Sequence, residues 1–141
     1  KGVASTSSAL VRGSKPRICA PMASTAASRA AAMSSFAMLS ALSGREHRVY
    51  TGVSVLRGDR AVTEHEETAV CFRELAPVEI WGYIATGEPM DKAGAYGIQG
   101  VGALLVRGIR GDYCNVVGLP VFRLGRMLAR FGVEPLAGAA R

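Results

Sequence analysis

Residues 48–72 read RVYTGVSVLRGDRAVTEHEETAVCF, and this stretch decides the fold. Every second position from Val49 to Val55 carries a β-branched side chain, so residues 48–56 predict a strand with one strongly β-branched face. Residues 57–60 predict a tight turn, and residues 61–72 predict a second, antiparallel strand. We interpret the three acids of that second strand as a solvated edge rather than a catalytic cluster: Glu64, Glu66 and Glu67.

Apolar residues recur at helical spacing both before and after this predicted hairpin. Residues 30–43 predict a helix that ends at Ser43-Gly44, and a second helix begins at Pro77 and ends at Thr86-Gly87. Residues 121–131 predict a third helix, which ends at Gly132. Three basic residues lie on the side of this helix opposite its apolar positions: Arg123, Arg126 and Arg130.

The remaining apolar run is residues 103–106, ALLV, which predicts a short central strand. Residues 107–112 predict a turn. The expected order is therefore helix, two strands, helix, loop, strand, loop and helix. That order indicates a mixed α/β fold without the strict strand–helix alternation of a doubly wound parallel sheet.

Composition is typical of one domain. The 141 residues are 49% apolar and 20% charged, enough to bury a core. No run approaches the ~18 consecutive apolar residues of a membrane span, so we expect no membrane association. The three cysteines are odd in number and form no C-x-x-C pair, which favours a reducing, cytoplasmic compartment over disulfides or structural zinc.

The net charge of +6 belongs to the front of the chain. Residues 1–45 carry six basic residues and no acid, whereas the basic and acidic residues of 46–141 balance. Residues 1–35 are rich in Ala and Ser, which predicts a poorly ordered basic leader. A targeting segment and a nucleic-acid-binding segment are the weaker alternatives, the latter because residues 1–45 hold a single aromatic, Phe36.

Two glycine-rich segments indicate a binding site: residues 91–100, DKAGAYGIQG, and residues 111–120, GDYCNVVGLP. Glycine gives up packing so that the backbone can turn or approach a ligand closely. The dinucleotide fingerprint and the P-loop motif are both absent. Any phosphate binding would therefore use a lysine point charge and backbone amides.

Four ordered blocks closely resemble the Maf family of nucleoside triphosphate pyrophosphatases. They are LSGREHRVYTGV at 42–53, YIATGEP at 83–89, DKAGAYGIQG at 91–100 and NVVGLP at 115–120. The resemblance covers residues 36–133, which we take as the nucleotide-binding domain, with 134–141 as a tail. The forms of the last two blocks resemble the branch associated with dTTP and UTP.

This resemblance implies hydrolysis of a nucleoside triphosphate to the monophosphate and pyrophosphate, by carboxylate-activated water that attacks the α-phosphorus, with Mg²⁺ or Mn²⁺. It implies a mixed elongated sheet with flanking helices, similar to inosine triphosphatase, with an incomplete N-terminal lobe, and often a homodimer. Lys92 would contact phosphate and Gln99 would read the base or position the substrate. Three further candidates also have simpler roles as cap or turn residues: Asp91, Asp112 and Asn115.

The front of the chain departs from the family pattern. Family members carry an A-D-T motif, whose aspartate is the expected general base, and a later G-K-P lysine. Ala4-Ser5-Thr6 and Gly13-Ser14-Lys15-Pro16 align with these motifs, which makes Thr6 and Lys15 substrate-binding candidates. Ser5 occupies the aspartate position, and a serine is no base near neutral pH. Truncation, a shifted reading frame and divergence each account for this front.

Two functions from different classes follow. The first is a pyrophosphatase that removes dTTP, UTP or related modified pyrimidine nucleotides from the nucleotide pool. The second is a non-catalytic Maf-like protein that acts in cell division or septum regulation through partner binding. Ser5 is the residue on which the choice depends, because the first function requires a general base.

Overall fold

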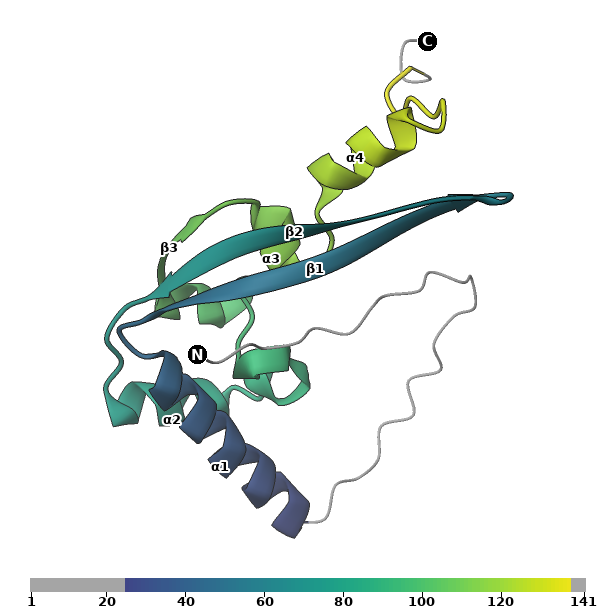
Figure 1. Cartoon of the computed structure of the whole chain (residues 1–141). Helices are drawn as coiled ribbons and strands as arrows, with labels where there is room; N and C mark the ends of the chain where they lie inside the picture. The colour runs from purple at the N-terminus through teal and green to yellow at the C-terminus, as the bar shows by residue number, and fades with distance from the viewer. Residues whose placement is uncertain (1–24, 138–141) are drawn as a thin grey trace. The chain divides into compact units, whose positions relative to one another are not determined.

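The computed structural model describes residues 25–137. Predictions for Ser5, Thr6, Lys15 and most of the leader lie outside the described residues. The elements are drawn in Figure 1. They are α1 Thr25–Leu42, β1 Glu46–Arg57, β2 Arg60–Phe72, α2 Pro77–Ala85, the 3₁₀ turns η1 Glu88–Asp91, η2 Ala93–Ala95 and η3 Gly100–Leu105, then β3 Val106–Arg110, α3 Tyr113–Val117 and α4 Val121–Ala129.

The predicted hairpin is confirmed. β1 and β2 form the long two-stranded ribbon of Figure 1, and β3 adds to β2 to give a three-stranded antiparallel sheet in the order β1-β2-β3. Gly58 has a φ of 58° at the first position of the two-residue turn, where a type II′ hairpin turn needs a positive φ. The fold is thus mixed α/β with flanking helices, as predicted.

The chain divides into two compact units. The first contains His47–Val70 and the described residues from Ile109 onward, and the second contains the described residues up to Glu46 together with Cys71–Gly108. All three strands pass from one unit into the other. Each unit is described below by itself.

The first unit has a small core on the sheet. Val70 and Met127 are almost completely buried, and Arg57 donates a hydrogen bond of 2.7 Å to the carbonyl oxygen of Phe131. The guanidinium carbon of Arg60 lies 4.7 Å from the centre of the Phe131 ring, a cation–π contact. These contacts hold the end of α4 against the hairpin.

The second unit buries the apolar face of α2 against α1. Leu39 and Ile80 have exposed fractions of 0% and 2%. Phe36 of α1 stacks on Trp81 of α2 with ring centres 4.6 Å apart, and Phe72 meets Tyr96 edge to face at 4.8 Å. Aromatic pairs in these geometries add stability beyond the area they bury. This core supports the glycine-rich segment that follows α2.

The start of α2 is fixed by a charged side chain. The backbone N–H of Ala76 donates to Glu79 Oε2 at 2.9 Å, and Arg73 donates to both carboxylate oxygens of Glu79, at 3.1 and 2.7 Å. A carboxylate in the first helical turn satisfies a free backbone donor and favours the helix dipole. The predicted helix from Pro77 is therefore confirmed, with an anchor that the apolar spacing did not indicate.

Several predicted boundaries were wrong. Helix α1 begins at Thr25 rather than at residue 30, so it starts inside the segment interpreted as a leader. Residues 103–106 are not a strand, because Gly100–Leu105 form a 3₁₀ helix, and the strand is Val106–Arg110, where a turn was expected. The five-residue helix α3 was not predicted.

The acids in β2 have charged partners that the sequence did not indicate. The five-residue β3 lies beside the C-terminal end of β2, where the N–H of Arg73 donates to the carbonyl oxygen of Leu105 and Thr68 bonds Asp112, so β3 does not extend along the acids. Glu64 and Glu66 accept hydrogen bonds from Arg123 of α4, and Glu67 forms an ion pair with Arg48 at 2.8 Å. These acids thus bind arginines of neighbouring elements, which alternation along one strand could not indicate. Within residues 25–137, no helix is both long and apolar enough to cross a bilayer.

Candidate functional site

The glycine-rich segment after α2 lies entirely in the second unit and is built from short 3₁₀ turns. Gly94 and Ala95 have φ angles of 76° and 60°. A buried alanine with a positive φ is uncommon, since its Cβ crowds the backbone in this region. The surrounding structure therefore holds the segment in one shape.

Two close approaches, one to the backbone and one to a side chain, shape the loop at residues 97–102. A Cβ on Gly102 would lie 2.1 Å from the carbonyl oxygen of Gly97, and a Cβ on Gly100 would lie 2.5 Å from Glu88 Oε1. The backbone contact excludes a side chain at Gly102, and the positive φ of 67° favours glycine at position 100. Glycine is required here because the chain packs against itself and against a carboxylate.

Two side chains fix the same loop from outside. The N–H of Gly97 donates to the hydroxyl oxygen of Tyr83 at 3.1 Å, and the N–H of Val101 donates to Glu88 Oε2 at 3.0 Å. Burial raises the pKa of Tyr83, so its hydroxyl stays neutral at physiological pH. We call Tyr83 and Glu88 the loop anchors. Both stand in a block that resembles the family, but no spacing indicated their role, because it depends on tertiary contact.

Lys92 and Asp91 form an exposed ion pair beside this loop. Lys92 Nζ lies 2.7 Å from Asp91 Oδ1, and their side chains are 43% and 77% exposed. This hydrogen bond is the main reason that the pKa of Lys92 is raised and that of Asp91 lowered, so both stay charged at neutral pH. The Lys92 stem runs past Gly97, whose Cβ would meet Cε at 3.5 Å. The ammonium group is thus charged, accessible and held next to the closed loop.

Gln99 lies between the two anchored backbone positions. Its side chain is exposed and makes no hydrogen bond to any residue from 25 to 137. A primary amide offers both a donor and an acceptor, which suits the edge of a nucleobase. The structure therefore brings Asp91, Lys92 and Gln99 onto one anchored loop of the second unit.

Asp112 and Asn115 belong to the first unit and are placed differently. Asp112 caps α3, with Oδ1 accepting from the N–H of Cys114 at 2.8 Å. Asn115 is fully buried, and its amide nitrogen donates to Thr68 Oγ1 at 2.9 Å and to the carbonyl oxygen of Val49 at 3.2 Å. Their cap and turn roles are therefore present, and contact with a substrate stays a prediction for both.

Thr68 completes this buried network. Its hydroxyl donates to the carbonyl oxygen of Asp112 and accepts from the N–H of the same residue, both at 3.1 Å. A Cβ on Gly111 would lie 2.9 Å from Thr68 Oγ1, so glycine permits this close approach. Asp112 Oδ2 and Asn115 Oδ1 are buried without a partner among the described residues. This glycine-rich segment therefore serves packing between α3 and β2.

The described residues do not form a metal site. Between residues 25 and 137, no three His, Cys, Asp or Glu side chains gather closely enough to hold an ion. Asp91 is engaged by Lys92, and Glu88 accepts from Val101. The oxygen ligands that Mg²⁺ or Mn²⁺ requires are thus not assembled by this part of the chain.

Comparison with known proteins gives consistent matches. A family model described as Maf-like protein matches residues 26–131. The chain is 63% identical over 100 residues to a dTTP/UTP pyrophosphatase of Moorella thermoacetica, which covers 69% of this chain and 51% of that protein. It is 55% identical over 103 residues to a dTTP/UTP pyrophosphatase of Symbiobacterium thermophilum, covering 73% and 53% of the two chains.

A protein of the same name from Bacillus cereus is 54% identical over 97 residues, covering 69% of this chain and 51% of its own length. The chain thus spans about half the length of the curated relatives it matches. The matched region includes the loop anchors and the Lys92–Gln99 loop, and it also includes α3.

Proposed function

We propose, from the fact that this chain belongs to the family of Maf-like proteins, that it hydrolyses dTTP, UTP or a related modified pyrimidine nucleotide. The products would be the nucleoside monophosphate and pyrophosphate. The observation that carries the proposal is the anchored loop, which presents Lys92 and Gln99 within the region shared with dTTP/UTP pyrophosphatases.

Each side chain of the loop has a proposed role. The Lys92 ammonium would bind phosphate oxygens, with Asp91 holding it in place until the more highly charged triphosphate competes for it. The Gln99 amide would hydrogen-bond the pyrimidine edge. The loop anchors would keep both groups in position, because a binding group is useful only when its backbone is fixed before the ligand arrives. Asp112 and Asn115 would act indirectly, through the packing of α3.

The reaction requires water to attack the α-phosphorus while the bond to the β-phosphate oxygen breaks and pyrophosphate leaves. We assign no general base among the described residues, since Glu88 and Asp91 are both engaged in the loop. Thr6 and Lys15 remain proposed substrate contacts outside the described residues. No step is assigned to a metal, and Mg²⁺ or Mn²⁺ is proposed only as the counter-ion of the triphosphate.

The test is pyrophosphate release from dTTP and UTP by the full chain, with Mg²⁺ or Mn²⁺ present. Lys92→Ala should reduce the rate at least ~tenfold, as expected when a charge-assisted contact to phosphate is lost. Arg107→Gln is the matched control, because it removes an exposed positive charge from β3 in the same unit. Turnover by the wild-type chain no greater than that of Lys92→Ala would refute the activity.

Binding without turnover would favour the second function. Ser5 at the position of the family aspartate is the observation behind this alternative, in which a Maf-like protein acts in cell division through partner binding. Calorimetric titration with dTTP separates the two, since a binding heat without pyrophosphate release fits only the non-catalytic protein. From the same family relationship we also propose the elongated Maf-like sheet with a nucleotide cleft, a homodimer and a cytoplasmic location.

A further inference from the structure

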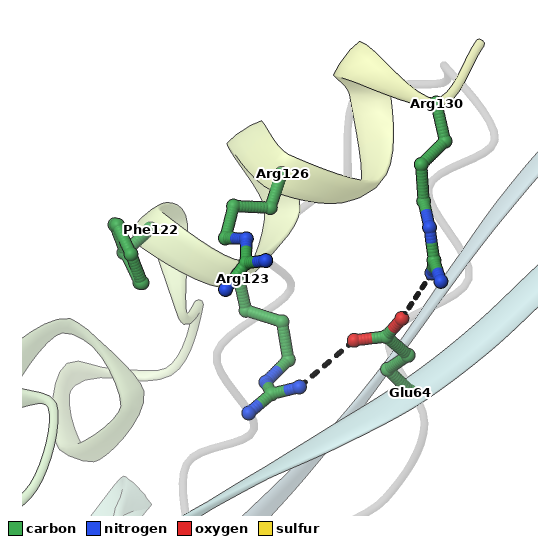
Figure 2. Close-up of a pocket in the computed structure, with 5 residues that line it drawn as sticks. All are labelled: Glu64, Phe122, Arg123, Arg126 and Arg130. Atoms are coloured by element: carbon green, nitrogen blue, oxygen red, sulfur yellow. Dashed lines mark hydrogen bonds and ion pairs between the residues drawn. The ribbon is translucent and has the colours of Figure 1, made fainter.

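Helix α4 carries three arginines on one face. Arg123, Arg126 and Arg130 stand at positions i, i+3 and i+7 of a helix, so their side chains project on the same side. Together with Glu64 of β2 and Phe122, they line a pocket of about 230 Å³ (Figure 2). All five residues belong to the first unit, whereas the Lys92 loop belongs to the second.

Like charges at this spacing repel one another, so the face needs counter-charges. Glu64 supplies one, with Oε2 2.8 Å from Arg123 and Oε1 bonded to Arg130, as the dashed lines of Figure 2 indicate. Glu66 supplies another, at 2.5 Å from Arg123 Nε. The hydrogen bond from Arg123 is the largest cause of the lowered pKa of Glu64, which therefore stays ionised at neutral pH.

Arg126 is the exception. It lies between Arg123 and Arg130 along the helix and is exposed, and it makes no ion pair or hydrogen bond with any residue from 25 to 137. Three guanidinium groups line the pocket, and two carboxylates neutralise part of their charge: Glu64 in the wall and Glu66 bonded to Arg123. The pocket therefore retains a net positive charge, and no residue from 25 to 137 engages the donors of the Arg126 guanidinium.

We propose that this pocket binds a phosphoryl group, with Arg126 as its principal ligand and Arg123 and Arg130 completing the positive wall. The planar fork of a guanidinium matches two phosphate oxygens, and the net positive charge of the cluster attracts an oxyanion. At about 230 Å³ the pocket is smaller than the ~300–1,000 Å³ that surrounds a whole drug-sized ligand. It fits inorganic phosphate, pyrophosphate or the phosphoryl end of a larger metabolite.

Phe122 bears on which of these ligands binds. Its side chain is 73% exposed at the pocket rim, where a ring face could stack on the organic part of a phosphorylated metabolite. Free phosphate makes no use of such a face. Removal of the Phe122 ring therefore distinguishes free phosphate from a phosphorylated metabolite as the ligand.

The experiment is isothermal titration calorimetry of the full chain with sodium phosphate, pyrophosphate and uridine monophosphate, with chloride keeping the ionic strength constant. Arg126→Gln should weaken binding of all three at least ~tenfold, because it removes a charged hydrogen-bond donor. Arg107→Gln, which removes an exposed arginine from β3, should leave the affinities within twofold of wild type. Phe122→Ala should weaken only uridine monophosphate if the organic part stacks on the ring.

Lys92→Ala separates this pocket from the proposed pyrophosphatase site. Phosphate binding that persists in Lys92→Ala and disappears in Arg126→Gln supports the pocket, whether or not the chain hydrolyses dTTP. The proposal is overturned if the wild-type chain binds none of the three anions, or if Arg126→Gln binds them as tightly as wild type. Helix α4 ends near Arg126, and an arginine there also favours the helix dipole. That role would lower the thermal midpoint of Arg126→Gln in chloride without changing phosphate affinity.

Discussion

The two glycine-rich segments use polar side chains in opposite ways. In residues 91–100 the polar groups of Lys92 and Gln99 are exposed, and the backbone is held by Tyr83 and Glu88. In the second segment Asn115 is completely buried and ties α3 to the sheet. Both segments look alike as sequence, yet one leaves its polar groups available to a ligand and the other uses them for folding.

The largest effect on stability should come from the buried residue Asn115 of the second glycine-rich segment. Asn115→Ala removes the donor to Thr68 and to the carbonyl oxygen of Val49 and leaves a cavity, so we expect a loss of about 3 kcal/mol in unfolding free energy. Urea unfolding followed by circular dichroism measures it. Gln99→Ala is the matched control and should change stability by less than about 0.5 kcal/mol. Similar losses for both variants would erase the distinction between the segments.

Closure of the loop gives the next effect. Gly102→Ala places a methyl group 2.1 Å from the carbonyl oxygen of Gly97, so the loop must open, at a cost of about 2 kcal/mol. Gly108→Ala is the control, because nothing lies within 4 Å of its Cβ position. Nucleotide affinity, measured by calorimetry with dTTP, should fall in Gly102→Ala and stay unchanged in Gly108→Ala. Unchanged affinity in both variants would mean that the closed loop is not the nucleotide site.

Removal of one loop anchor tests whether anchoring matters for Gln99. Glu88→Ala leaves the N–H of Val101 without its acceptor, and we expect a loss of about 1 kcal/mol in stability. Its effect on dTTP affinity should not add to that of Gln99→Ala in the double variant, because both changes act through the side-chain amide of Gln99. Glu88→Gln keeps an acceptor oxygen and should restore much of the affinity. Additive effects would instead assign the two residues to separate contacts.

A smaller effect concerns pH and the start of α2. Hydrogen bonds from Arg73 and from the N–H of Ala76 lower the pKa of Glu79 from 4.5 to about 2. Because the folded-state pKa is depressed, this stabilisation is complete above pH 4.5 and is lost as pH falls towards 2. The stability of Glu79→Gln should therefore fall less steeply over that range than wild type, in urea melts at several pH values. Glu134→Gln, an exposed change near the end of the described chain, should keep the wild-type slope.

The smallest effect on stability should come from Lys92→Ala, although it should strongly reduce nucleotide affinity. The ion pair of Lys92 with Asp91 is exposed to solvent, where such pairs contribute little. Thermal melts should therefore show no measurable change, while calorimetry with dTTP shows weaker binding. A large drop in the melting midpoint would show that Lys92, like Asn115, mainly stabilises the fold.

Much of the fold could be predicted where one periodicity was unambiguous. The hairpin, α2 and α4 followed from alternation and from helical spacing. The run at 103–106 failed because a short apolar segment fits a strand and a buried helical turn equally well. β3 was missed because Arg107, Gly108 and Arg110 look like turn residues when strand pairing is unknown.

The candidate site likewise contains residues that could be predicted and residues that could not. Lys92 and Gln99 followed from resemblance, and the structure places both on one exposed loop. The loop anchors could not be predicted, because Tyr83 and Glu88 reach backbone groups 14 and 13 residues away in sequence. The pairing of Glu64 with arginines of α4 spans still longer separations and likewise depends on tertiary packing.

The contact between Gly102 and the carbonyl oxygen of Gly97 has a consequence for protein engineering. The loop is held by this close approach and by the loop anchors, none of which involves the side chain at position 99. That residue therefore contributes little to the shape of the loop and can be exchanged. A saturation library at Gln99 should therefore yield mostly folded proteins. Altered base preference could then be selected at a single codon, without compensating changes elsewhere in the chain.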